Sequence, residues 1–321
     1  MELNSIMIGP LKIFSGSANI PLAKAICTRA GVELGACEIG KFSNENIKVK
    51  ICDSVRGQDV FIVQPSCAPV NEGIMELLIM IDAAKHASAG RITAVLPYFP
   101  YVRSDKKDEP RISITARLMA DLLHTAGADR VMTMNLHSPQ IQGFFRMPVD
   151  HLLAGRLLCE YFTNLGTENC VVVAPDAGSA KHAGAYARRL GLPLAILDKR
   201  RSDDSENPNI HNVIGDVKGK RALIFDDEIA SGGSIIEVVK ALENLGVTEI
   251  SACCVHAVLS GKASEKLQSS SLTKLVVTDT VYIPEEKKFP KLEVISVAEL
   301  FARAIMYTNS GRSISGLYNG Y

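Results

Sequence analysis

Short apolar, β-branched runs alternate with helical patterns along almost the whole chain of 321 residues. Several runs are continuously apolar, as expected of parallel strands that are covered on both faces. The predicted strands are Leu11–Phe14, Asp59–Val63, Ile92–Leu96, Val131–Met134, Cys170–Ala174, Leu194–Leu197, Ala222–Phe225, Ser251–Val258 and Lys274–Thr278. The predicted helices are Asn71–His86 (with Asn71 as its N-cap), Ser113–Ala126, His151–Leu165, Gly178–Leu190, Gly233–Leu245 and Val297–Tyr307. This alternation predicts an α/β fold of mostly parallel sheets flanked by helices.

The length favours two domains, because a typical domain holds about 100–200 residues. Two halves of similar size and similar element order meet near Asp150. We therefore expect an N-terminal domain over 1–150 and a C-terminal domain over 151–321. An internal duplication is one interpretation of this similarity.

Charge and cysteine content narrow the class of protein. The 35 Lys and Arg residues cancel the 35 Asp and Glu residues, which argues against a generally basic nucleic-acid-binding face but leaves local basic pockets open. No apolar run reaches the roughly 18 residues of a membrane-spanning helix, and Met1–Gly16 lacks the pattern of a signal peptide. The eight cysteines form no C-x-x-C pair, so free thiols are expected. We expect a cytoplasmic protein with no nucleic-acid or membrane partner.

The most informative segment follows the predicted strand Ala222–Phe225. Asp226 and Asp227 come first, and the loop Ser231–Ser234 then runs directly into a helix. Backbone amides at a helix N-terminus favour a phosphate, and carboxylates accept hydrogen bonds from vicinal hydroxyls. The pattern is neither a P-loop nor a dinucleotide fingerprint. It indicates a sugar-phosphate site; the alternative is an ordinary capped helix with solvated acids.

The segment Ala174–Lys181 repeats this design with a single acid, Asp176. One interpretation is a second anion site with Asp176 as a metal ligand; the other is an Asx-type cap. Two such loops would suit a polyphosphate ligand that requires Mg²⁺.

Three further loops carry candidate residues. His137 follows an apolar strand, at the position where sites form in α/β sheets. Tyr98–Lys107 interleaves aromatic and cationic residues that could stack a base and hold phosphates, and Lys199–Arg201 places three cations after a strand. Each of these segments also has an interpretation without a functional role: His137 could be a structural histidine, and the other two segments could be solvated loops.

Taken together, these segments resemble the ribose-phosphate pyrophosphokinase family over essentially the whole chain. The matching segments are Phe42–Asn44, Ser54–Gly57, Met75–Leu78, Ser88–Val95, Leu136–His137, Gln140–Phe145, Pro148–Asp150, Pro175–Gly178 and Gly215–Val217. The Gln140–Phe145 string is the more specific signal, because the sugar-phosphate loop is shared with phosphoribosyltransferases generally.

The resemblance implies two phosphoribosyltransferase-like domains, with ATP on the N-terminal side and ribose 5-phosphate on the C-terminal side. The implied reaction transfers the diphosphoryl group of MgATP to the 1-hydroxyl of ribose 5-phosphate, with Lys199 and Arg201 as catalytic residues. The implied metal ligands are His137 and Asp176. The implied ribose 5-phosphate contacts are Asp226, Asp227, Ser231, Gly232, Gly233 and Ser234. The implied ATP contacts are Phe42, Asn44, Asn46, Arg103, Ser104, Asp108 and His137, of which Phe42 and Asn44 would come from a neighbouring subunit.

The resemblance also implies a homo-oligomer, from dimer to hexamer, and a regulatory site for phosphate or ADP. The matching positions are Ser54, Arg56, Ser88, Arg111, Ser313, Ile314 and Ser315. These side chains offer guanidinium and hydroxyl donors that suit an anion, but without the resemblance they could be separate surface residues.

The chain departs from the family pattern at Asn46, Ser104, Asn135, Arg146 and Ala230, and four of these five replacements remove a carboxylate. Mg²⁺ affinity, nucleotide choice and ribose handling are therefore the properties most open to change. Two alternatives to the pyrophosphokinase stay open. One is a weakly active or non-catalytic paralogue that regulates a catalytic subunit, and the other is a phosphoribosyltransferase that acts on a base.

Overall fold

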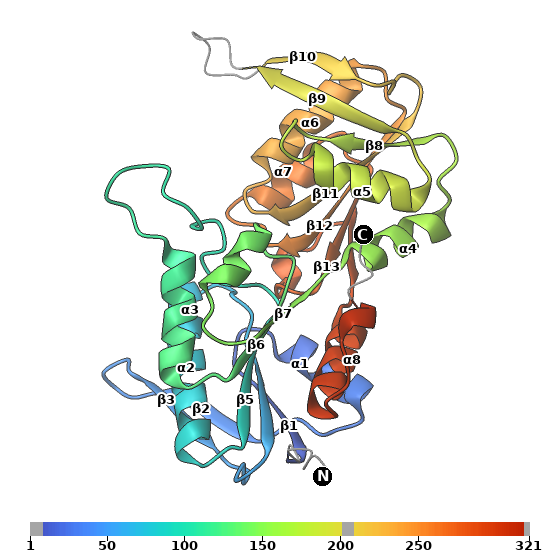
Figure 1. Ribbon diagram of the computed structural model, residues 1–321. Helices are drawn as coiled ribbons and strands as arrows, with labels where there is room; N and C mark the ends of the chain where they lie inside the picture. The colour runs from blue at the N-terminus through green and yellow to red at the C-terminus, as the bar shows by residue number, and fades with distance from the viewer. Residues whose placement is uncertain (1–8, 201–208, 318–321) are drawn as a thin grey trace. The chain divides into compact units, whose positions relative to one another are not determined.

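The computed structural model describes residues 9–200 and 209–317 (Figure 1). Contacts between Cα atoms divide the chain into two compact units. The first contains the described residues up to Leu153, with Thr280–Tyr282 and the described residues from Ser296 onward. The second contains Ala154–Asp279 and Ile283–Ile295. Each is an α/β unit built on its own sheet.

The first unit holds a parallel sheet of five strands in the order β1-β4-β5-β6-β7. Helices α2 and α3 cover one face and share a core with it, in which Ile62, Met80 and Leu123 are buried. Helix α1 packs against α8 on the other side (Figure 1). The bounds are β1 Leu11–Ser15, α1 Ile20–Ala30, β4 Asp59–Val63, α2 Val70–His86, β5 Arg91–Leu96, α3 Thr115–Ala126, β6 Arg130–Met134, β7 Val149–Leu152 and α8 Ala298–Asn309.

A two-stranded antiparallel hairpin, β2 (Cys37–Lys41) and β3 (Ile47–Ile51), projects from the first unit (Figure 1). Its strands alternate between half-buried and exposed residues, and Ile39, Val49 and Ile51 pack against the core that contains α2. The sequence analysis did not predict this hairpin, because neither strand is a continuous apolar run.

The second unit holds seven strands in the order β10-β9-β8-β11-β12-β13-β14, all parallel except β10. Its core is rich in valine and isoleucine, as in Val171, Ile224 and Val277. The bounds are α4 Gly155–Leu165, β8 Cys170–Ala174, α5 Ala180–Leu190, β9 Leu194–Arg200, β10 Asn209–Ile214, β11 Arg221–Ile229, α6 Gly233–Asn244, β12 Glu249–Ala257, α7 Ala263–Ser269, β13 Lys274–Thr278 and β14 Leu292–Ile295. Short 3₁₀ turns lie at η1 Pro139–Phe144, η2 Glu285–Lys287 and η3 Ser315–Leu317.

Each of the nine predicted strands is present and the mostly parallel α/β fold is confirmed, with corrections at element ends. The strands β7, β10 and β14, like the hairpin, were not predicted. The predicted helix over His151–Leu165 is wrong at its start, because His151 lies in β7 and α4 begins at Gly155. His151 is buried, and its Nε2 accepts a hydrogen bond from the Leu136 amide at 2.9 Å. Burial lowers its pKa to about 4. It is therefore a structural, neutral histidine.

Asn71 is not the N-cap of α2. The cap position is Pro69, and the Asn71 Oδ1 instead accepts a hydrogen bond from the Tyr101 hydroxyl at 2.6 Å. Asp226 and Asp227 also differ from expectation, because β11 continues through them to Ile229 rather than ending at Phe225.

The C-terminal helix α8 packs in the first unit, which differs from the expected division into 1–150 and 151–321. Arg91 connects α8 to the sheet of the first unit. It donates to the Asp59 carboxylate at 2.6 Å and to the Thr308 carbonyl at 3.0 Å. Asn309 donates to the same carboxylate at 2.9 Å. Because the Asp59 side chain is fully buried and compensated by these donors, α8 is fixed at the beginning of β4 and β5.

Candidate functional site

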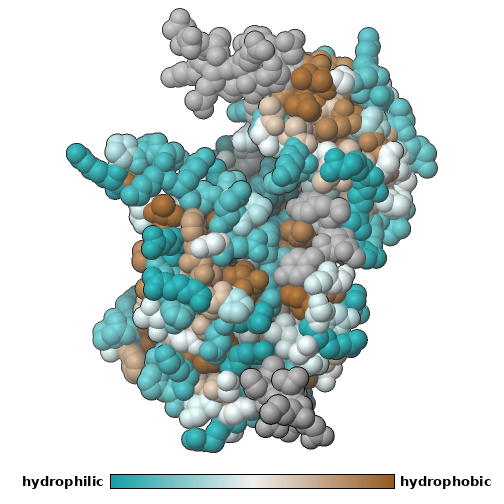
Figure 2. Space-filling view, viewed as in Figure 1, coloured by the Kyte–Doolittle hydropathy of each residue, from teal (hydrophilic) through white to brown (hydrophobic). Residues whose placement is uncertain are grey.

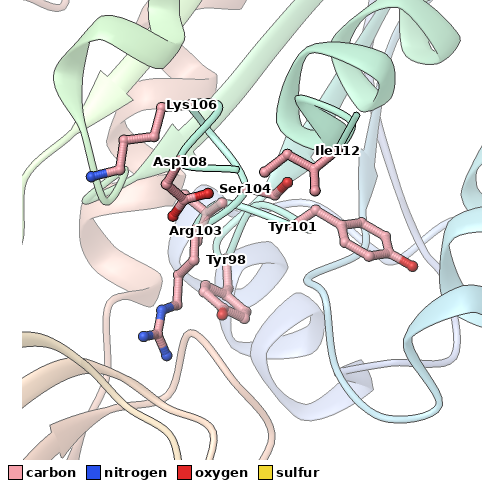
Figure 3. A pocket seen from close by; sticks show the side chains of 8 residues that line it. Tyr98, Tyr101, Arg103, Ser104, Lys106, Asp108 and Ile112 are labelled. Carbon is pink, nitrogen blue, oxygen red and sulfur yellow. The ribbon is translucent and has the colours of Figure 1, made fainter. Parts of the chain in front are cut away.

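In the first unit, a pocket of about 350 Å³ opens directly after β5 (Figure 3). Two aromatic residues, two cations and one acid contribute to it, which gives a polar and mainly positive wall. The lining residues are Tyr98, Tyr101, Val102, Arg103, Ser104, Lys106, Asp108 and Ile112. Pockets at the carboxyl ends of parallel strands are where α/β folds bind ligands. An aromatic face beside two cations suits a base attached to phosphates.

The Tyr98 and Arg103 side chains extend in the same direction from the loop, whereas the Tyr101 ring extends to another side (Figure 3). Tyr101 has a φ of 52°, a left-handed conformation that is rare for an aromatic residue. Its hydroxyl bond to Asn71 holds the ring against the first turn of α2. Such backbone strain is typical of functional loops.

Ser104 lines the pocket, but its hydroxyl is engaged within the loop. The Ser104 Oγ accepts a hydrogen bond from the Thr115 amide at 3.3 Å and lies 3.2 Å from the Ser113 carbonyl oxygen. Asp108 and Lys106 are exposed at the same loop. The structure therefore brings together the predicted ATP contacts Arg103, Ser104 and Asp108.

The Gln140–Phe145 string supports this loop rather than lining the pocket. Ile141 is fully buried, and the Phe145 ring packs edge-to-face against Phe99 with centroids 5.3 Å apart. Arg146, one of the departures, forms an ion pair with Asp121 on α3 at 2.9 Å.

The hairpin residues Phe42, Asn44 and Asn46 are at the tip between β2 and β3, and none of them lines the pocket around Arg103 among the described residues. Phe42 is 54% exposed, with the Lys48 Nζ 5.8 Å from its ring centroid. The Phe42 amide donates to the Asn46 carbonyl at 2.9 Å, which closes the tip. An exposed aromatic ring on a closed hairpin is a feature that a second molecule can cover.

His137 is exposed after β6, two residues beyond Asn135. Asn135 is buried and has a φ of 38°, which asparagine tolerates better than most residues. Its amide donates to the Leu152 carbonyl at 3.0 Å, so this loop is anchored to β7.

In the second unit, Asp226 and Asp227 are neighbours in β11. The Asp226 Oδ1 accepts a hydrogen bond from the Asp227 amide at 2.8 Å. Burial, together with a hydrogen bond and the negative charge of Asp227, raises the pKa of Asp226 to about 7. Two carboxyl groups that share a proton can both accept from and donate to sugar hydroxyls.

The turn after β11 leads into α6 through Gly232, which is the N-cap with a φ of 74°. No side chain at the N-cap accepts a hydrogen bond from the first-turn amides of this helix. Ser231 and Ser234 are exposed on either side, while Gly232 is buried and Gly233 is half-buried. This is the geometry of a phosphate-binding turn.

Asp176 precedes α5, as predicted. The Asp176 Oδ1 accepts a hydrogen bond from the Ser179 amide at 2.8 Å, and the Ser179 hydroxyl donates to the Asp176 carbonyl at 2.9 Å. These are the contacts of the Asx-type turn that the sequence left as the alternative. One carboxylate oxygen is engaged in this turn.

Within 9–200 and 209–317, no group of three or more His, Cys, Asp or Glu side chains has the geometry of a metal site.

The predicted regulatory residues fall into three groups. Arg56 donates to the Ser88 hydroxyl at 3.4 Å, with Ser54 exposed nearby in the sequence. Ser313 donates to Ser315 at 2.9 Å in the turn that contains Ile314, after α8. Arg111, however, lies on the loop that follows the carboxyl end of β5, whereas Ser88 precedes the strand. The strand separates the two, so a single chain does not bring Arg111 to the others.

Of the two predicted catalytic residues, the structure describes the backbone of Lys199, which lies in β9 rather than after the strand as expected. Lys199 pairs with Ile210 of β10 through the backbone, and its side chain is outside the described part of the structure. Arg201 lies outside the described residues altogether.

No described helix is long and apolar enough to cross a membrane.

The sequence analysis did not single out Tyr98, Tyr101, Lys106 and Ile112 as individual site residues, although they line the pocket. The signal was present in the alternation of aromatic and cationic residues over Tyr98–Lys107. Choosing among them required the loop conformation.

Comparisons with known proteins cover both units. Residues 11–127 match the family described as the N-terminal domain of ribose phosphate pyrophosphokinase, and residues 150–285 match the phosphoribosyl transferase domain. The chain is 51% identical over 310 residues to a ribose-phosphate pyrophosphokinase of Caldanaerobacter subterraneus subsp. tengcongensis, covering 96% of this chain and 98% of that one. It is 50% identical over 315 residues to the enzyme of Deinococcus radiodurans, with 96% and 98% covered. The crystal structure of phosphoribosylpyrophosphate synthetase from Mycobacterium smegmatis superposes with a TM-score of 0.89 at 43% identity, covering 94% and 99%.

Proposed function

The chain belongs to the ribose-phosphate pyrophosphokinase family, and on that premise we propose how its residues serve the reaction. The protein makes phosphoribosyl pyrophosphate and AMP from ATP and ribose 5-phosphate. The anomeric hydroxyl of ribose 5-phosphate attacks the β-phosphorus of ATP and loses its proton. The bond from that phosphorus to the oxygen bridging to the α-phosphate breaks, and AMP leaves.

The pocket after β5 is the proposed ATP site. Arg103 and Lys106 would neutralise phosphate charge, and Tyr98, which extends in the same direction as Arg103, would contact the base or ribose (Figure 3). This combination of aromatic and cationic side chains in one pocket of about 350 Å³ is the observation that carries the proposal. Asp108 would contribute a hydrogen-bond acceptor, and His137 follows the neighbouring strand β6.

The turn from β11 to α6 is the proposed ribose 5-phosphate site. The amides of Gly232, Gly233 and Ser234 would hold the 5-phosphate, with the hydroxyls of Ser231 and Ser234 as further donors. Asp226 and Asp227 would bind the ribose hydroxyls. The raised pKa of Asp226 lets this pair carry a proton near neutral pH, so it can donate as well as accept.

We assign Mg²⁺ as the cofactor. When bound, it would neutralise charge on the ATP phosphates. Asp176, on an exposed turn, and His137 are the residues that would lie near it. The absence of a three-ligand protein cluster in the described residues is compatible with an ion held largely by the nucleotide.

Lys199 and Arg201 are the proposed catalytic cations. Phosphoryl-type transfer depends mainly on positioning and charge stabilisation, so cations that meet the transferring group would stabilise its transition state. The place of Lys199 in β9, in the same sheet as β11, supports this assignment.

The active protein is proposed to be a cytoplasmic homo-oligomer. The exposed Phe42 ring, with Asn44 and Asn46 beside it, would complete the adenine pocket of a second copy. The pair Arg56–Ser88 would bind phosphate or ADP as an effector, with Arg111 supplied by another copy. A monomer in light scattering would contradict the proposed assembly. An Arg56→Ala variant with an unchanged phosphate dependence of its activity would contradict the proposed effector site.

The direct test of the function is AMP release by the purified protein with ATP, Mg²⁺ and ribose 5-phosphate. We expect AMP only when the sugar phosphate is present. No AMP above the no-sugar control, with folded protein, would instead support the regulatory alternative, which no feature of the described structure favours. An Arg103→Ala variant should raise the KM for ATP while leaving that for ribose 5-phosphate nearly unchanged.

A further inference from the structure

Helix α3 follows the ATP-site loop and lacks a cap of its own. Its N-cap is Ile114, whose side chain makes no capping hydrogen bond. The first amides of a helix have no intrahelical acceptor, so they need a partner from elsewhere. Apolar residues such as isoleucine are among the poorest N-caps.

Ser104 supplies that partner from the opposite end of the loop. The Thr115 amide donates to the Ser104 Oγ at 3.3 Å, and the Ala116 amide donates to the Ser104 carbonyl at 3.1 Å. The Ser104 Oγ also lies 3.2 Å from both the Ser113 carbonyl oxygen and the Thr115 Oγ1. Residues 11 positions apart are thereby joined into a closed loop.

Most side chains of the loop between these ends are exposed. Lys106, Asp108 and Arg111 are all exposed, so the packing of their side chains cannot fix the backbone. Arg103 immediately precedes Ser104, and the Ser104 amide donates to the Tyr101 carbonyl at 2.9 Å. The same residue therefore connects the strained turn at Tyr101 to the start of α3.

We propose that Ser104 is a positioning residue that caps α3 and closes the loop carrying Arg103, Lys106 and Asp108, so that the ATP site is ordered before ATP binds. This inference rests on the proposed function, because it takes the pocket after β5 as the ATP site. The role differs from the direct ATP contact expected at this position, since the hydroxyl is directed to the helix.

The kinetic test compares Ser104→Ala with Ser104→Thr, which keeps a hydroxyl. A loop that must be ordered during binding lowers affinity, so Ser104→Ala should raise the KM for ATP by roughly three- to tenfold. It should change kcat and the KM for ribose 5-phosphate little, and Ser104→Thr should restore most of the ATP affinity. The matched control is Thr125→Ala, which removes a hydroxyl at the other end of α3 and should leave all three constants unchanged.

Amide hydrogen exchange of the ATP-free protein gives a readout that is independent of activity. Ser104→Ala should speed exchange at the Thr115 and Ala116 amides, while exchange in the second half of α3 should stay as in wild type. If Ser104→Ala failed to fold, Thr115→Val, which removes only the hydroxyl contact, should show a smaller rise in the KM for ATP. Unchanged constants and unchanged exchange in the folded variant would overturn the proposal.

Arg103→Ala separates failure of this inference from failure of the proposed function. If Arg103→Ala raises the KM for ATP and Ser104→Ala does not, the pocket binds ATP but Ser104 does not position it. If neither variant changes the KM for ATP, the pocket is not the ATP site. A Ser104→Thr variant as impaired as Ser104→Ala would also contradict the capping role.

Discussion

The Asp226 Oδ1 accepts a hydrogen bond from the Asp227 amide at 2.8 Å, and the neighbouring Asp227 carboxyl helps raise the pKa of Asp226 to about 7. The proposed ribose-binding pair therefore lowers the stability of the free protein near neutral pH. An isolated carboxylate of this kind would ionise near 3.8 in the unfolded chain.

The first prediction follows from the sign of this shift. Between a pH of about 4 and 7 the folded state binds more protons at Asp226 than the unfolded state, so the contribution of this group to stability falls as the pH rises. Asp226→Asn removes this penalty. The variant should exceed wild type in Tm by a few degrees at pH 8, and by less at pH 5.

Thermal unfolding at the two pH values measures this difference. Glu243→Gln, a change at an exposed acid of α6, should show the same Tm difference from wild type at both. An Asp226→Asn advantage that did not grow with pH would show that the carboxyl is ionised at an ordinary pKa.

The second prediction concerns the phosphate turn. Gly232→Ala places a side chain at a φ of 74°, 3.4 Å from the Leu267 side chain, and should displace the amides that we propose hold the 5-phosphate. We expect a KM for ribose 5-phosphate that is at least tenfold higher, with a stability loss of about 1–2 kcal/mol from the left-handed conformation.

Gly191→Ala is the matched control, because Gly191 has a φ of 66° with open space around its Cβ position. It should lose similar stability without a change in the KM for ribose 5-phosphate. Equal KM effects in both variants would mean that the turn at Gly232 has no special relation to the substrate.

The third prediction concerns the proposed catalytic cations, Lys199 in β9 and Arg201. Lys199→Ala and Arg201→Ala should each lower kcat by roughly 100-fold while changing the KM for ribose 5-phosphate little, because their contacts form mainly in the transition state. Lys262→Ala, at an exposed lysine before α7, should behave as wild type. Near-normal turnover in both loop variants would remove this segment from the chemistry.

The fourth prediction concerns the missing carboxylates. Ala230 is half-buried in the turn that follows the strand, so Ala230→Asp would add a carboxylate beside the proposed substrate site. It should lower the free Mg²⁺ needed for half-maximal rate severalfold, because more charged ligands strengthen the site. Ala230→Asn has a similar shape without the charge and serves as the control. A Mg²⁺ requirement that Ala230→Asp leaves unchanged, or raises, would refute this account.

Much of the fold follows from local patterns. Strand β8 is a continuous apolar run and β13 has an apolar centre, and the bounds of both were predicted correctly. The hairpin β2–β3 was missed because its strands alternate between half-buried and exposed residues and form no continuous apolar run. His151 was wrongly assigned to a helix because the hydrogen bond that it accepts from Leu136 is a tertiary contact, which the local sequence does not show. The placement of α8 depends on the bond between Asn309 and Asp59, which are 250 residues apart in the sequence.

Some features of the candidate site could be predicted from the sequence, whereas others depend on tertiary contacts. The acids and glycines that follow the predicted strand Ala222–Phe225 predict the turn at Gly232 and the pair Asp226–Asp227, because their chemistry is visible in the sequence. The extension of β11 through these acids is set by its pairing with β12. The loop-closing role of Ser104 depends on an amide 11 residues away, which no local pattern indicates.

The central claim is that the diphosphoryl group moves in one step from ATP to the 1-hydroxyl of ribose 5-phosphate. Phosphorus NMR of the purified protein with ATP, Mg²⁺ and ribose 5-phosphate identifies the products directly. The account predicts equal amounts of AMP and a sugar that bears a diphosphate at carbon 1 and keeps its 5-phosphate. Formation of ADP with a sugar bisphosphate, or of AMP with free pyrophosphate and unchanged sugar phosphate, would contradict it.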